Sequence, residues 1–363
     1  MKNNKIRRVL ILISFMTLPT TAIFFPAAFS QEAVNDSIQA VSDTLQDFGL
    51  FTKTDLMHLA LRFDLKAYTR KKPKDEYLKA ILTYYINEKD SVNKEVRLKS
   101  RGEFRNGFCS FPPIRLNFSK SDMKRPDLKK IGKLKLVTHC QSGNEEYLFK
   151  EYLIYKLYNV LTDNSFRVRL AAVDYISTTQ KNKVIRSYGF FIEPLEILAE
   201  RLNAVPVESP ALNQKVIIPE MMDRVAIFNY MIGNTDWSVP GQHNCKVLSG
   251  SNFSNPGLGM IIPYDFDYSG LVNADYAIPT EGLGIDRVTQ RRFLGICRPE
   301  ETFKKELKEF SDKKSEFYKV INDFGYLSDK EKKGMISYLD EFYSSLEKTD
   351  GILNIFNNEC KEF

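Results

Sequence analysis

The order of strand-like and helix-like segments is the feature that most constrains the fold of this chain. Five strand-like segments come first, one helix follows over 145–161, and two more strand-like segments come after that helix. Within the helix, Leu148, Tyr152 and Tyr155 recur close to helical spacing, and the acidic residues lie in its first half. The strand-like segments are 56–65, 76–86, 94–102, 112–118, 133–140, 166–176 and 184–194.

From position 195 onward the pattern becomes mostly helical. The segment "PEMMDRVAIFNYMIG" predicts a long helix with Pro219 in its first turn, and Ser328 with Glu331 forms a capping box near the C-terminus. Strands, one helix, strands and then helices is the order of a protein-kinase-like fold. We therefore predict an α+β fold with two lobes, a β-rich N-terminal lobe over 31–194 and a mostly helical C-terminal lobe over 195–363.

The first 30 residues have the pattern of a secretory signal peptide. Basic residues precede the mostly apolar run 9–16, and the small-residue stretch "AAFS" ends at Ser30, where we predict cleavage. We therefore expect an exported protein, periplasmic or extracellular, with no membrane span after cleavage. The net charge of +6 includes four basic residues and no acidic ones in this leader. The remaining chain is nearly balanced, which gives no argument for binding nucleic acid.

The five cysteines predict at least one disulfide in an exported protein. Cys109 and Cys140 both belong to the strand-rich part, and we predict a bridge between them. The odd number leaves at least one cysteine free or bonded to another molecule. The sequence contains no CxxC pair and its three histidines are far apart, which argues against a zinc site.

Two polar motifs in the second half carry the candidate chemistry. The loop "GNTDWSVPGQHN" contains Asp236 and Asn244, and the segment "IIPYDFDYSG" places Asp265 and Asp267 after an apolar run. Phosphoryl transfer needs metal ions that neutralise phosphate charge and a carboxylate that orients the attacking hydroxyl. A loop Asp and Asn followed by an Asp at a strand end is the order in which protein kinases supply these groups.

Together with "RGEFR", "FPPIRLNF" and "YGFFIEPLE", these motifs resemble the CotH-type kinases, and more weakly the HipA-like kinases. The resemblance covers roughly positions 56–270. It implies an exported atypical kinase that uses ATP and Mg²⁺ to phosphorylate a protein or another cell-surface acceptor. It also implies that Asp236 is the catalytic Asp, and that Asn244, Asp265 and Asp267 are the metal-binding residues.

The chain departs from the kinase pattern in two places. Asp236 and Asn244 lie eight positions apart, not the five of the usual protein-kinase loop. The cation that pairs with phosphate is not fixed by the motifs, because Arg115 and Lys135 both lie on strands before the helix. Glu151 is the expected helix partner of that cation. We count these three residues, with Glu193 of "YGFFIEPLE", as the predicted nucleotide-binding residues.

Other interpretations of the same residues stay open. Asp236, Asn244 and Asp265 also suit loops in which they only bind backbone groups. Because an exported protein meets little ATP, a kinase-fold binding module without turnover is a second alternative. A structural surface protein whose acidic loop binds calcium is a third. The "DFD" segment offers few carboxylates for a calcium loop. The basic run 120–135 is interpreted as a solvated loop.

Overall fold

The computed structural model describes residues 49–87, 89–118, 132–181, 183–209, 212–250, 258–348 and 351–362. All of them lie within the unit Asp47–Phe363. The predicted signal peptide and most of the basic run 120–135 lie outside the described residues.

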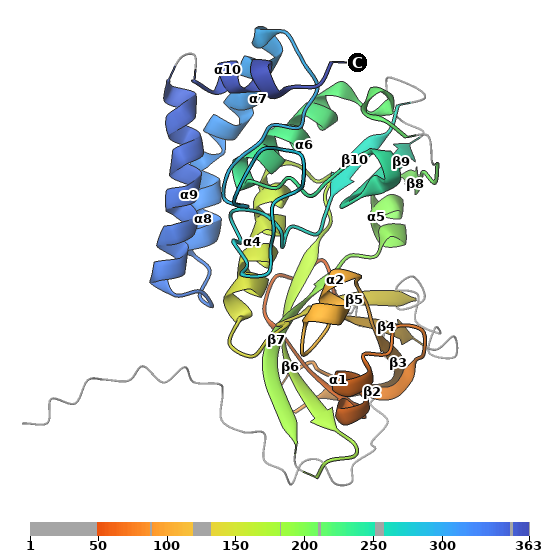
Figure 1. The fold of residues 1–363 in the computed structure, drawn as a ribbon. Coiled ribbons are helices and arrows are strands. Elements are labelled where there is room, and N and C mark those ends of the chain that lie inside the picture. The colour runs from red at the N-terminus through yellow and green to blue at the C-terminus, as the bar shows by residue number, and fades with distance from the viewer. Residues whose placement is uncertain are drawn as a thin grey trace, which may run out of the picture. The chain divides into compact units, whose positions relative to one another are not determined.

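Within the described residues, the seven strand-like segments form seven strands that close into a barrel (Figure 1). Neighbouring strands are antiparallel except β1 and β6, whose parallel pairing closes the barrel. The sequence predicts these strands but not the closure, because alternation does not reveal which strands become neighbours. The strands are β1 Met57–Phe63, β2 Leu78–Tyr85, β3 Ser91–Ser100, β4 Ile114–Phe118, β5 Lys133–Thr138, β6 Val168–Ser177 and β7 Val184–Ile192.

Alternation along the strands separates the interior of the barrel from its outer face. Leu134 and Leu136 of β5 are buried in the barrel core, whereas Val137 packs into the core of the helical part. Because successive side chains of a strand point to opposite faces, Lys135 shares the face of Val137. Arg115 on β4 pairs with Lys135 in the sheet register. These two cations therefore lie on the outer face of the barrel, on its helical side.

Helix α4 (Glu145–Leu161) joins the barrel to the helical part, and its bounds are those predicted from the sequence. It packs on β6 and β7 on one side and on α8 on the other, which explains why it is buried nearly all round. Two short helices connect strands of the barrel and were not predicted: α1 (Leu65–Lys71) follows β1, and α2 (Phe104–Phe108) follows β3. The remaining α-helices among the described residues are α5 Leu195–Arg201, α6 Pro219–Ile232, α7 Glu300–Asp312, α8 Lys314–Asn322, α9 Asp329–Glu347 and α10 Gly351–Glu359.

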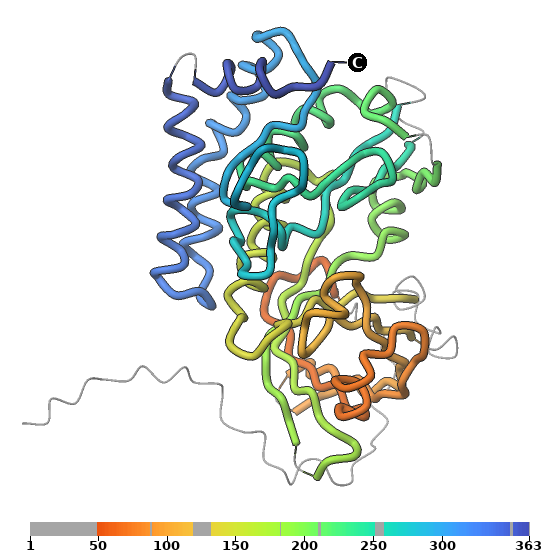
Figure 2. The backbone as a smooth tube through the Cα atoms, viewed as in Figure 1, coloured from red at the N-terminus to blue at the C-terminus, as the bar shows by residue number. Residues whose placement is uncertain are grey.

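The C-terminal part also contains a small sheet that the sequence did not predict. It consists of β8 (Ala204–Pro206), β9 (Cys245–Gly250) and β10 (Met260–Pro263). After β10 the chain winds without a regular element until α7, as the backbone tube shows (Figure 2). The predicted α+β composition, strand-rich first and helical afterwards, is confirmed. The arrangement of a two-lobed kinase remains a prediction.

Two disulfides are formed among the described cysteines. Cys109–Cys140 is the predicted bridge, and Cys297–Cys360 is a second one. Cys245 is buried and unbridged, as the odd number requires. Among the described helices, none is long and apolar enough to cross a membrane. The disulfides are compatible with the predicted export.

Candidate functional site

Asp265 and Asp267 are fixed by the buried residue between them. Phe266 is fully buried and packs edge-on against Tyr155 of α4 and Phe228 of α6. Asp265 has a φ of 62°, and its N–H donates to the Tyr155 hydroxyl at 2.9 Å. Anchoring Phe266 in the helical core therefore sets the positions of both neighbouring acids.

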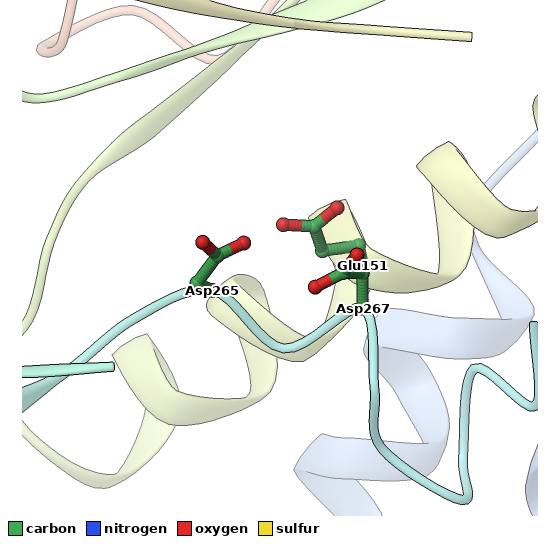
Figure 3. A group of neighbouring side chains, drawn as sticks. All are labelled: Glu151, Asp265 and Asp267. Carbon is green, nitrogen blue, oxygen red and sulfur yellow. The ribbon is translucent and has the colours of Figure 1, made fainter. Parts of the chain in front are cut away.

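Glu151 lies in the middle of α4 and completes a group of three carboxylates with Asp265 and Asp267. Their nearest ligand oxygens all lie within 4.8 Å of one another, where α4 meets the chain after β10 (Figure 3). The Glu151 side chain is fully buried and that of Asp267 is 7% exposed. The sequence motifs placed Asp265 and Asp267 together, and the fold adds Glu151 from 114 positions earlier than Asp265.

The partner of Glu151 is Arg105, which the sequence analysis did not assign. Arg105 Nη2 lies 2.7 Å from Glu151 Oε2 and 2.7 Å from Asp267 Oδ2. Arg105 Nε donates to the same Asp267 oxygen at 2.8 Å. Tyr276 Oη donates to Asp267 Oδ2 at 3.1 Å and accepts from Arg105. The expected pairing of Glu151 with Arg115 or Lys135 is therefore corrected: α2 brings Arg105 to Glu151 instead. The only signal was "RGEFR", which supported the family resemblance without suggesting a partner.

Burial controls the ionisation of this group. It raises the pKa of Glu151 to about 8 against the opposing effect of Arg105, and it raises the pKa of Asp267 to about 6 in the same way. Burial alone lowers the pKa of Arg105, but Asp267 and Glu151 beside it raise that pKa well above its ordinary value. Arg105 is thus held as a cation. Glu151 Oε1 is buried and has no hydrogen-bond partner among the described residues.

Asp265 faces a second set of charges, which are basic. Burial first, and then Arg101 and Arg115, lower the pKa of Lys135 to about 8, and Asp265 opposes them. Lys135 Nζ lies 5.1 Å from the ring centroid of Tyr264, the residue before Asp265. No hydrogen bond or ion pair to the Asp265 carboxylate occurs within the described part of the chain. Basic side chains beside an unpaired carboxylate suit a phosphate group that carries a metal ion.

Asp236 and Asn244 also come together, in the loop after α6. Gly233 ends that helix with a φ of 67°, a left-handed conformation that favours glycine. Asn244 Nδ2 donates to Asp236 Oδ2 at 2.9 Å and to its backbone oxygen at 2.7 Å. His243 Nε2 lies 2.6 Å from Asp236 Oδ1. The sequence analysis assigned His243 no role, so His243 is a residue of the candidate site that it missed.

The Asp236 loop is connected to the acidic group through the small sheet. The backbone oxygen of Asn244 accepts from the N–H of Tyr264, which precedes Asp265, at 3.0 Å. Burial first, and then Asp267, Asp236 and Asp265, raise the pKa of Tyr268 to about 12, so acids of both sets act on this hydroxyl. The longer spacing between Asp236 and Asn244 accommodates a turn that still returns Asn244 to Asp236.

Glu193 has a different environment from the other predicted nucleotide-binding residues. Its carboxylate accepts from Arg201 Nε at 3.1 Å and Nη2 at 2.8 Å, and from the N–H of Arg167 at 3.0 Å. Its own N–H donates to the Arg167 oxygen. These bonds fix the chain where β7 passes into α5. The Glu193 side chain therefore stabilises this connection, and we do not propose that it binds nucleotide.

Comparison with known proteins finds structural likeness but no sequence match. No protein-family model matches the chain, and no curated protein matches its sequence. Among solved structures, a proinflammatory kinase of Helicobacter pylori, CtkA, is similar over 58% of this chain and 86% of its own, with a TM-score of 0.36 and 12% identity. That TM-score is too low to define a shared fold or to transfer site residues. The resemblance to CotH-type kinases remains a prediction from the motifs.

Proposed function

We propose that the protein is a kinase-like phosphotransferase that uses ATP with Mg²⁺ and phosphorylates a protein or another cell-surface acceptor. The observation that carries the proposal is the position of Asp265. Its carboxylate has no hydrogen-bond or ion-pair partner among the described residues, lies within 4.8 Å of the buried acids, and interacts electrostatically with Lys135. A carboxylate that can hold a metal ion, close to cations that can bind phosphate, is what phosphoryl transfer requires.

The residues take the following roles in the proposal. Asp265, with the side-chain oxygen of Asn244, would hold Mg²⁺, which when bound neutralises charge on the phosphates. Lys135 and Arg115 bind the phosphate oxygens. Asp236 orients the acceptor hydroxyl and takes its proton as the hydroxyl oxygen attacks the γ-phosphorus. The bond from that phosphorus to the bridging oxygen breaks, and ADP leaves.

Thermal stability of the purified protein tests the binding half of the proposal. ATP at about 100 times its dissociation constant should add about 2.7 kcal/mol of stability, and only when Mg²⁺ is present. Asp265→Asn should abolish this shift. Asp286→Asn is the matched control, because Asp286 is an exposed acid in the same irregular segment. A folded parent that gains no stability from Mg²⁺ and millimolar ATP would refute the proposal.

Phosphate transfer to the protein itself or to a generic acceptor tests the catalytic half. Asp236→Asn should keep the metal-dependent shift with ATP and lose transfer, because Asp236 acts on the acceptor and not on the nucleotide. The parent should show both.

A binding module without turnover is the second candidate, and one observation favours it. Both carboxylate oxygens of Asp236 are engaged, one by His243 and one by Asn244. An acceptor hydroxyl must displace or share one of these contacts. If the parent shows the nucleotide shift and no transfer to any of a broad set of peptide and surface-polymer acceptors, the binding module is the better description.

A further inference from the structure

Arg105 reaches the acidic group from a distant part of the chain. It lies on the five-residue helix α2 between β3 and β4, and its partners Glu151 and Asp267 are 46 and 162 positions away. Its side chain is only 12% exposed. No other basic side chain within the described residues makes an ion pair with Glu151 or Asp267.

The guanidinium contacts two of the three acids that could hold a metal ion. Three carboxylates with oxygens within 4.8 Å of one another are a suitable ligand set for a divalent ion. Arg105 contacts two of the three, so one positive charge already lies beside Glu151 and Asp267. Glu151 Oε1, fully buried and without a partner in the described structure, shows that the group retains ligand capacity that Arg105 does not use.

We propose that Arg105 is a built-in cation that replaces a metal ion between Glu151 and Asp267, leaving Asp265 as the carboxylate that is open to the metal of a nucleotide. Asp267 is then a partner of Arg105 and not a metal ligand, in contrast to the expectation from the sequence. The role of Asp265 rests on the proposed function. The role of Arg105 does not, and it is tested with metal alone.

Removing the guanidinium should turn the acidic group into a metal site. In Arg105→Gln, the three carboxylates lose their cation, and we expect Mn²⁺ to bind about tenfold or more tightly than to the parent. Arg105→Lys keeps a positive charge beside the acids and should stay close to the parent. Adding Glu151→Gln to Arg105→Gln should reverse the gain, because it removes one of the ligands.

The measurement is a titration of Mn²⁺ followed by its electron paramagnetic resonance signal, without nucleotide, with folding checked by circular dichroism. A gain in Arg105→Gln that is lost in the double variant supports the proposal. A folded Arg105→Gln that binds Mn²⁺ no more tightly than the parent overturns it. So does a parent that already binds Mn²⁺ tightly through Asp267, shown by loss of that binding in Asp267→Asn.

A variant that unfolds in buffer is still informative. If Arg105→Gln refolds on addition of millimolar Mn²⁺ and not with NaCl of equal ionic strength, the metal has replaced the guanidinium. If neither salt restores the fold, the proposal fails. The outcome is separate from that of the proposed function: a parent with no response to ATP, together with a gain of Mn²⁺ binding in Arg105→Gln, removes the kinase proposal and keeps this one.

Discussion

Replacing Arg105 by Met should destabilise the protein by an amount that grows with pH. The change leaves Glu151 and Asp267 buried without a cation. Breaking a buried ion pair by removing one partner costs about 3–5 kcal/mol, which is the loss expected at pH 8. At pH 5 both acids hold protons in the folded protein, since burial raises their pKa to about 8 and about 6. Only hydrogen bonds are then lost, about 1 kcal/mol.

The sign follows from proton binding. An acid whose pKa is higher in the folded state keeps its proton longer there than in the unfolded chain. Its contribution to stability is therefore present at low pH and is lost as the pH rises through the raised pKa. In Arg105→Met the pKa of Glu151 rises further because an attractive cation is gone. The deficit relative to the parent must increase between pH 5 and pH 8.

Urea unfolding of the disulfide-intact protein, followed by fluorescence of the single tryptophan, Trp237, measures this difference. Lys308→Met is the matched control, because Lys308 forms an exposed ion pair with Asp312 whose loss should cost well under about 1 kcal/mol at either pH. Equal deficits at pH 5 and pH 8, or a loss below about 1 kcal/mol at pH 8, would show that the reasoning is wrong.

Three further outcomes are expected. Replacing Cys109 and Cys140 together by Ser should cost about 3–4 kcal/mol of unfolding free energy, as the bridge spans 31 positions; an unchanged urea midpoint would contradict this. Gly189→Ala should lower stability by about 1–3 kcal/mol, because its Cβ would lie 2.9 Å from the Val137 backbone oxygen; thermal unfolding measures it. His243→Gln should reduce phosphate transfer about tenfold and leave the nucleotide shift unchanged; a loss of both would assign His243 to folding.

Local sequence patterns were sufficient to predict most helices and strands, but not which of them become neighbours in the fold. Helix α4 could be predicted to the residue because its acidic start and apolar repeat are continuous in the sequence. The pairing of β1 with β6 joins segments about 110 positions apart, and no local pattern encodes it. The small sheet was missed because β8 is only three residues long and β10 four.

The candidate site shows the same division. Asp265 and Asp267 could be found because they follow an apolar run, and Asp236 and Asn244 because they lie in a loop rich in turn residues. Arg105 could not be paired with Glu151, since an arginine on a five-residue helix gives no sign of which acid it will meet. Lys135 was a candidate from its strand, and its half-buried position beside Tyr264 distinguishes it from the exposed lysines.

The Cys109–Cys140 bridge ties the segment of Arg105 to the segment that leads into α4. Cys109 follows α2 directly, and its N–H donates to the Arg105 oxygen at 3.0 Å, while Cys140 lies five positions before α4 begins. Oxidation of this cysteine pair therefore restrains the segment of Arg105 relative to the segment that leads into α4, in addition to stabilising the fold. In the reduced chain, the segment that carries Arg105 would lack this covalent link to the segment that leads into α4.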